Sequence, residues 1–136
     1  MEERVRAIIK EGGNILLIHR VKKGREYWVF PGGGAEKTDA DHKSALAREC
    51  KEEIGVDIQV SDLFSIYELG EAGKGQREYF YFCKITGGKL GTGSGPEFQE
   101  GTHYEGMYVL EWIPLKDFSI KNIQPEEVKK KLQREA

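Results

Sequence analysis

Three glutamates close together in the chain are the residues best suited to chemistry. Glu49, Glu52 and Glu53 stand at i, i+3 and i+4, so on an α-helix their side chains share one face and repel each other by roughly a few tenths of a kcal/mol per pair. Glu52 and Glu53 also fall in the last turn, where the helix dipole disfavours anions. A divalent cation would relieve this conflict, and carboxylates suit Mg²⁺ or Mn²⁺. The alternative is a solvated acidic face balanced by Lys51 and Arg48.

A run of three glycines, Gly32-Gly33-Gly34, follows Pro31 and leads toward the acidic segment. We expect no regular element here, because glycine loses more backbone entropy on ordering than any other residue. The exposed N–H and C=O groups of such a run can line a site. The run lacks the Lys-Ser/Thr ending of a phosphate-binding P-loop and the spacing of a dinucleotide fingerprint. Its closeness to the glutamates is therefore its main functional signal.

The two features combine into a longer pattern between Gly33 and Val56. Its second half reads Arg48-Glu49-Cys50-Lys51-Glu52-Glu53-Ile54-Gly55-Val56. The segment resembles the Nudix box, Gly-x5-Glu-x7-Arg-Glu-U-x-Glu-Glu-x-Gly-U with U apolar, if Cys50 counts as apolar. The first half departs from the box by one extra residue, because the first box glutamate falls on Ala40 counted from Arg48 and on Asp39 counted from Gly33. We expect Asp39 to replace that glutamate in supporting Arg48.

The resemblance implies hydrolysis of a diphosphate linkage in a nucleoside diphosphate derivative or a nucleoside triphosphate, with Mg²⁺ (or Mn²⁺) as cofactor. Such an ion neutralises phosphate charge and acidifies a bound water, and a carboxylate takes the proton. The implied metal ligands are Glu49, Glu52, Glu53 and the Gly33 carbonyl. The implied catalytic residues are Glu52, Glu53, Arg48, which would orient a glutamate without touching substrate, and an acid from a later loop: Glu97, before Glu100 and Glu105.

Two other functional readings stay open. A Nudix-type module could bind a nucleotide as a sensor without cutting it; the intact glutamates favour the enzyme, whereas the altered start of the box keeps the sensor in play. A structural acidic-helix protein would leave the glycine run unexplained. The resemblance does not choose among oxidised deoxynucleotides, ADP-ribose, diadenosine polyphosphates and nucleotide sugars.

Four further residues are candidates for binding substrate. Arg20 and Arg77 could grip phosphate through two hydrogen bonds each, or could be exposed charges at strand ends. Tyr27 and Trp28 could stack on a base, or could be core residues, since alternation along a strand sends about half of its side chains inward.

The elements that must position these residues follow from local patterns. A turn at Glu11-Gly12-Gly13-Asn14 predicts a hairpin between Val5–Ile9 and Ile15–Ile18. Good helix formers predict a helix over Asp39–Ile54, with Thr38, Asp39 or Asp41 as cap and Gly55 after its end. On that helix a packing face would hold Ala40, Leu46, Ala47, Cys50 and Ile54. Further strands are expected at Tyr27–Phe30, Ile58–Val60, Leu63–Tyr67, Tyr79–Ile85 and Tyr108–Ile113, loops at Glu71–Gln76 and Thr86–Tyr104, and a last helix from Pro125 to about Gln133.

This order predicts an α+β fold, a Nudix-type α/β/α sandwich with a mixed sheet between helices, as one domain over residues 1–136 with its box at about 33–56. A net charge of −2 argues against binding to a nucleic acid polymer. No apolar run is long enough for a membrane span, and no signal peptide is visible, so we expect a cytoplasmic protein. Cys50 and Cys83 are interpreted as reduced packing residues. The sequence leaves a homodimer open.

Overall fold

The computed structural model describes residues 2–70, 75–92 and 106–135. The predicted hairpin turn opens the fold, because β1 (Glu2–Glu11) and β2 (Asn14–Lys22) are antiparallel neighbours with Lys10 opposite Ile15. The remaining elements are β3 (Arg25–Val29), β4 (Gly32–Gly34), α1 (His42–Ile54), β5 (Val56–Leu69), β6 (Gln76–Gly88), β7 (Met107–Pro114), the 3-10 helix η2 (Leu115–Ile120), β8 (Ile123–Gln124) and α2 (Glu126–Glu135).

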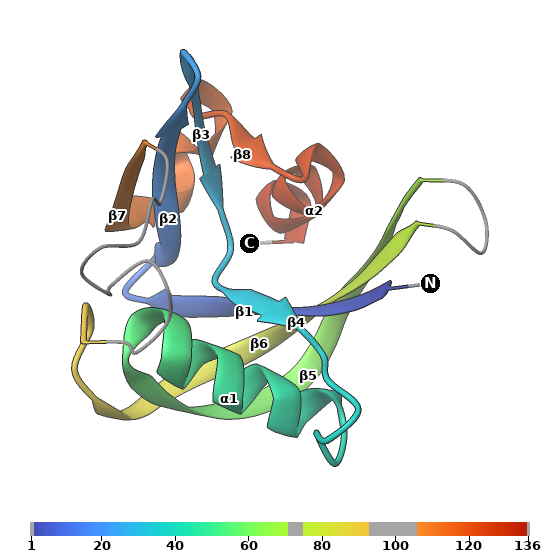
Figure 1. Ribbon diagram of the computed structural model, residues 1–136. Helices are drawn as coiled ribbons and strands as arrows, with labels where there is room; N and C mark the ends of the chain where they lie inside the picture. The colour runs from blue at the N-terminus through green and yellow to red at the C-terminus, as the bar shows by residue number, and fades with distance from the viewer. Residues whose placement is uncertain (1, 71–74, 93–105, 136) are drawn as a thin grey trace.

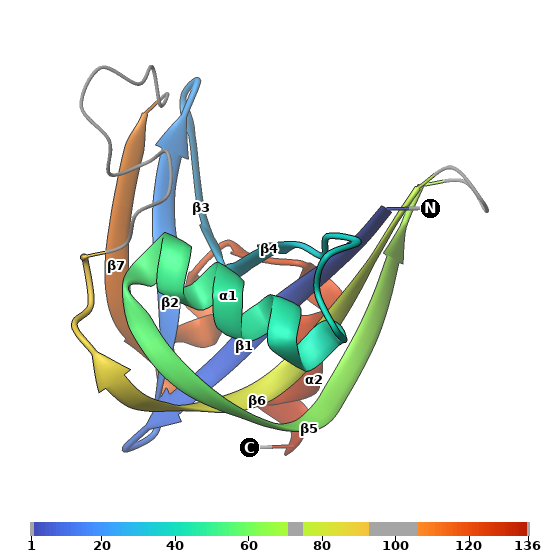
Figure 2. The same ribbon diagram turned by 60° about the horizontal axis from the view of Figure 1, so that its bottom comes forward.

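The strands of the described residues form one connected mixed sheet in the order β5-β6-β1-β2-β3-β8. Strand β1 runs parallel to β6 and antiparallel to the short β4, whereas β2 carries β3 on one edge and β7 on the other. The β1–β2 hairpin joins these two halves, which splay apart in Figure 1. The splay leaves the sheet curled around α1 on one side (Figure 2).

The two faces of the sheet bury separate apolar clusters. Alternate residues of β1 and β2 pack with Leu46, Cys50 and Ile54 of α1 on one face. The intervening residues pack with η2 and with Val128 and Leu132 of α2 on the other. The helices therefore cover opposite sides of β1 (Figure 1), which confirms the predicted α+β arrangement of a mixed sheet between helices. No helix in the described ranges is long and apolar enough to cross a membrane.

Several element predictions were wrong in detail. The glycine run is a short strand, β4, paired with Arg4–Arg6, so the expectation that no regular element forms there fails. The two strands expected at Ile58–Val60 and Leu63–Tyr67 are one bulged strand, β5, and β6 extends to Gly88, three residues into the predicted loop. The final helix was predicted from Pro125 to about Gln133 and spans Glu126–Glu135, so it begins one residue later than predicted. Residues 89–92 of the long loop are described, and residues 93–104 lie outside the described residues.

Candidate active site on helix α1

Helix α1 begins later than predicted and is fixed at both ends. Asp41 is the cap, with its carboxylate accepting the Ser44 amide at 2.7 Å, so the start expected at Asp39 was three residues too early. Gly55 ends the helix at φ +83, and its amide donates to Cys50 O and Lys51 O. The buried positions are Ala45, Leu46, Cys50 and Ile54; Ala40 precedes the helix and is exposed, and Ala47 is only half-buried.

Two of the three glycines of β4 are required by close contacts. A Cβ on Gly32, whose φ is +148, would stand 2.0 Å from the Val5 carbonyl oxygen. A Cβ on Gly33 would stand 2.2 Å from Glu49 Oε2, whereas one on Gly34 would meet nothing within 4 Å. The first glycine therefore allows β4 to approach β1, and the second allows α1 to bring Glu49 against the strand.

Two of the three glutamates of α1, Glu49 and Glu53, contact β4. Glu53 Oε1 accepts the Gly32 amide at 2.7 Å. Glu49 packs over Gly33 with 16% of its side chain exposed, whereas Glu52 is 46% exposed. Burial raises the pKa of Glu49, and Arg48 partly opposes this rise. The strand thus fixes Glu49 and Glu53 and leaves Glu52 toward solvent.

Arg48 links the cluster to the segment before the helix. Its Nε and Nη2 donate to the two oxygens of Asp39, both at 2.9 Å, and Nη2 also donates to Gly34 O at 3.1 Å. Its Nη1 donates to Glu49 Oε1 at 3.1 Å and to Glu52 Oε2 at 3.2 Å. The bidentate pair confirms that Asp39 supports Arg48. Hydrogen bonds from Arg48 hold the pKa of Asp39 at about 2, and those to Asp39 raise the pKa of Arg48.

The donor set of this cluster fits a hard divalent cation in its chemistry, because it consists of carboxylate and carbonyl oxygens. Arg48 lies between these carboxylates and bridges them. Among the described residues, no three His, Cys, Asp or Glu side chains converge on one point that could hold an ion. A cation that binds Glu49 and Glu52 together would therefore compete with Arg48 Nη1 for their oxygens.

The other sequence candidates lie in different places. Arg20 and Tyr27 are opposite each other on β2 and β3 and share the face of the sheet that carries α1. Trp28 is 5% exposed and belongs to the opposite cluster, where its ring stacks on His19 at 4.2 Å. Arg77 pairs with Glu68 at 2.7 Å on the β5–β6 ribbon. We therefore retain only Arg20 and Tyr27 as candidates for substrate contact; Glu97, Glu100 and Glu105 lie outside the described residues.

The sequence interpretation missed an apolar groove of about 370 Å³ on the α1 face of β2 and β7. Tyr108, Leu110 and Trp112 alternate along β7 and line it together with Leu16 and Leu90. The Gly91 amide donates to Ile54 O at 3.0 Å, which fixes this end of the groove to the end of α1. The alternation of β7 was the available signal, but it does not say which face of a strand meets the helix.

Comparison with known proteins agrees with this geometry. The sequence profile of the NUDIX domain family matches residues 2–133. A Caenorhabditis elegans protein that carries the name of a nudix hydrolase is 33% identical over 111 residues, which are 81% of this chain and 27% of that protein. The CTP pyrophosphohydrolase of Escherichia coli (strain K12) is 34% identical over 76 residues, or 54% of this chain and 56% of that enzyme.

The fold is similar to that of a MutT NUDIX hydrolase from Burkholderia pseudomallei, with a TM-score of 0.69 at 20% identity, covering 99% of this chain and 98% of that one. The chain spans only 27% to 56% of the length of the two curated relatives described above. The profile match, however, covers nearly all of its residues. The chain therefore belongs to the NUDIX domain family.

Proposed function

We propose that this chain is a Mg²⁺- or Mn²⁺-dependent hydrolase of a diphosphate linkage in a nucleoside diphosphate derivative or a nucleoside triphosphate. Enzymes of this family generally use divalent metal ions. The observation that supports the proposal best is the cluster of Arg48, Glu49 and Glu52 beside Glu53, which the Gly32 amide holds. A cluster of carboxylate oxygens supports the proposal because such oxygens are the ligands that a hard divalent ion prefers.

In this proposal Glu49, Glu52, Glu53 and the Gly33 carbonyl hold the metal. When bound, the ion supplies charge neutralisation at the diphosphate and a more acidic water. Arg48 orients Glu49 and Glu52 through Nη1 and is itself fixed by Asp39. Glu97 stays the first choice for the general base.

The apolar groove is the proposed place for the substrate's base. Aromatic side chains such as Tyr108 and Trp112 can stack on any base, since every base has a π-face. Arg20, whose guanidinium lies 5.4 Å from the centre of the Tyr108 ring, is the proposed contact for a phosphate on the same face. A cytoplasmic location, a single domain, a homodimer and the exclusion of nucleic acid polymers stay predictions.

A substrate panel tests the proposal directly. The purified chain is assayed with CTP, chosen because of the Escherichia coli relative, and with oxidised dGTP, ADP-ribose, a diadenosine polyphosphate and a nucleotide sugar, in Mg²⁺, Mn²⁺ or EDTA. We expect turnover that EDTA abolishes and that Glu53→Gln lowers at least about a hundredfold, whereas Glu127→Gln on the exposed side of α2 leaves turnover unchanged. Equal turnover by wild type and Glu53→Gln refutes the role of Glu53. Tight nucleotide binding without turnover supports the sensor instead.

A further inference from the structure

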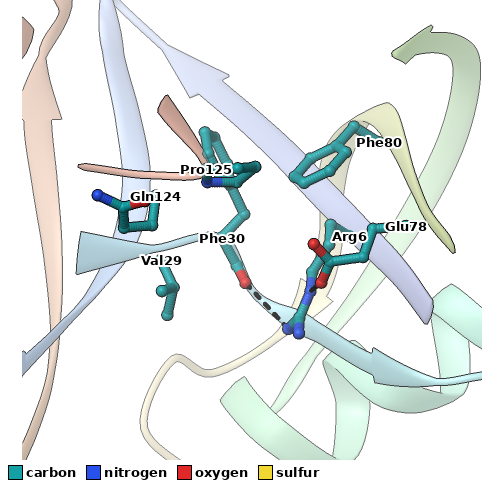
Figure 3. Close-up of a pocket in the computed structure, with 7 residues that line it drawn as sticks. All are labelled: Arg6, Val29, Phe30, Glu78, Phe80, Gln124 and Pro125. Carbon is teal, nitrogen blue, oxygen red and sulfur yellow. Dashed lines mark hydrogen bonds and ion pairs between the residues drawn. The ribbon is translucent and has the colours of Figure 1, made fainter. Parts of the chain in front are cut away.

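A partly buried ion pair lies on the face of the sheet opposite α1. Arg6 Nε and Glu78 Oε1 are 3.1 Å apart, with only 17% and 13% of their side chains exposed. The pair lines a cavity of about 100 Å³ together with Phe30, Phe80 and Pro125 (Figure 3). Because the two charges already face each other, we assign no ligand to this cavity.

Arg6 has a second contact that reaches toward the active site. Its Nη1 donates to the Phe30 carbonyl at 3.4 Å, the dashed contact drawn in Figure 3. Phe30 precedes Pro31 and Gly32, and Gly32 donates the amide that holds Glu53. Only one residue, Pro31, thus separates the carbonyl that Arg6 binds from the amide that orients a proposed metal ligand.

The segment between β3 and β4 has few other backbone restraints. Pro31 has no N–H to donate, and its carbonyl is held by the Ala7 amide at 2.8 Å. Arg6 also lies opposite Gly32 in the β1–β4 register. The Arg6 guanidinium therefore binds this segment on the face of the sheet opposite α1, and the backbone of β1 binds it through the strand pairing.

We propose that the Arg6–Glu78 pair positions Glu53, with Arg6 holding the backbone before Gly32 and Glu78 holding Arg6. This inference rests on the proposed function in that Glu53 must take part in hydrolysis. Stability alone gives little reason to keep such a pair, because a buried ion pair is often replaced by apolar residues of similar size without loss. Orientation of the Phe30 carbonyl does give a reason to keep the pair. The planar, permanently charged guanidinium of Arg6 fixes the direction of a hydrogen bond better than an apolar contact would.

The double variant Arg6→Met/Glu78→Met separates positioning from stability. We expect its midpoint of thermal unfolding to stay within a few degrees of wild type, because both charges leave together. We expect kcat to fall about tenfold while KM stays within about twofold, as for the loss of an outer-shell partner of a metal ligand. The Gly32 amide, followed by NMR hydrogen exchange, should exchange faster, whereas the amides of Leu16 and Leu17 in β2 should not.

Two variants complete the test. Arg4→Met removes an arginine from the same strand and the same face, where its pair with Glu2 is more exposed, and should leave kcat and Gly32 exchange unchanged. Arg6→Lys keeps the charge beside Glu78 and should restore folding fully and kcat in part, so it replaces the double variant if that variant does not fold. A folded double variant, or Arg6→Lys in its place, with wild-type kcat and wild-type Gly32 exchange overturns the inference. If the wild type hydrolyses nothing in the panel, the proposed function fails, and Gly32 exchange alone decides the positioning.

Discussion

The contact between Gly33 and Glu49 allows a sharp prediction, because a single methyl group tests it. In Gly33→Ala the new Cβ would stand 2.2 Å from Glu49 Oε2 and 2.4 Å from its carboxyl carbon. Ordinary van der Waals contact begins at 3.4 Å, so the carboxylate must retreat by about 1.2 Å. The backbone of Gly33, unlike that of Gly32, is not in the region reserved for glycine.

The magnitude follows from what must move. The obstacle is the end of a flexible side chain, and an alanine in place of glycine restricts the unfolded chain, so the free energy of unfolding should change by less than about 1 kcal/mol. A displacement of about 1 Å in a catalytic group costs up to about a hundredfold in rate. Gly33→Ala should therefore be a stable protein with ten- to about a hundredfold lower kcat/KM.

The neighbouring glycines are matched controls. Gly34→Ala meets nothing within 4 Å and should keep both stability and activity. Gly32→Ala drives its Cβ to 2.0 Å from the Val5 carbonyl at a φ that disfavours alanine, and should lose about 2–3 kcal/mol of stability. Urea unfolding and steady-state kinetics with the best substrate of the panel measure all three. The reasoning is refuted if Gly33→Ala is as active as Gly34→Ala, or as unstable as Gly32→Ala.

Three further predictions rest on other contacts. Arg48 holds the pKa of Asp39 at about 2, below its usual 3.8. The stability that Asp39 contributes is therefore complete above pH 3.8 and is lost as pH falls through 2. In urea unfolding, wild type should be more stable than Asp39→Asn by a constant amount near neutrality, and this difference should disappear as pH falls from 3.8 to 2. Burial raises the pKa of Cys50 and brings that of Cys83 to about 12, so neither thiol should react with a thiol-directed disulfide at pH 8 until guanidinium unfolds the chain; fast reaction of the native protein would contradict the packing. Trp112→Leu should raise KM more than it lowers kcat, because Trp112 lines the groove. Ile120→Ala, at an 80% exposed position, should change neither constant. An unchanged KM in Trp112→Leu would contradict binding of the base in the groove.

Local sequence signals predicted the elements that local chemistry determines. The turn residues Gly12 and Gly13 have positive φ, as the hairpin prediction requires, and Gly55 ends α1 in the left-handed conformation. Strand β4 was unpredictable on the same basis, because three glycines carry no strand preference and its pairing with β1 is a tertiary contact. The short β8 depends likewise on its partner Trp28.

The parts of the site whose geometry depends on spacing along the chain were predictable from the sequence. The parts that depend on how the strands pair in the sheet were not. Counting along the box placed Asp39 beside Arg48, and the structure confirms that pair. Alternation on β3 separates Tyr27 from Trp28 but does not say which of them faces α1. The contact between Gly32 and Glu53 joins residues 21 positions apart, and the role of Arg6 needs a neighbour 72 positions away; neither follows from a local pattern.

The charges of the cluster bear on which cation it would take. Arg48 brings one positive charge to the carboxylates of Glu36, Asp39, Glu49 and Glu52, so three negative charges stay uncompensated when all five groups are ionised. A divalent ion would offset two of these charges, whereas a monovalent ion would offset one. Arg48 Nη1 already bridges Glu49 and Glu52. An ion that binds both of these carboxylates would therefore take the place of the positive charge of Arg48 between them. Arg48 is also held by Asp39 and Gly34 O on its other edge, so its position does not depend on the two glutamates alone. The repulsion between Glu49 and Glu52 is thus relieved in part by Arg48, and a bound ion would share that task with it.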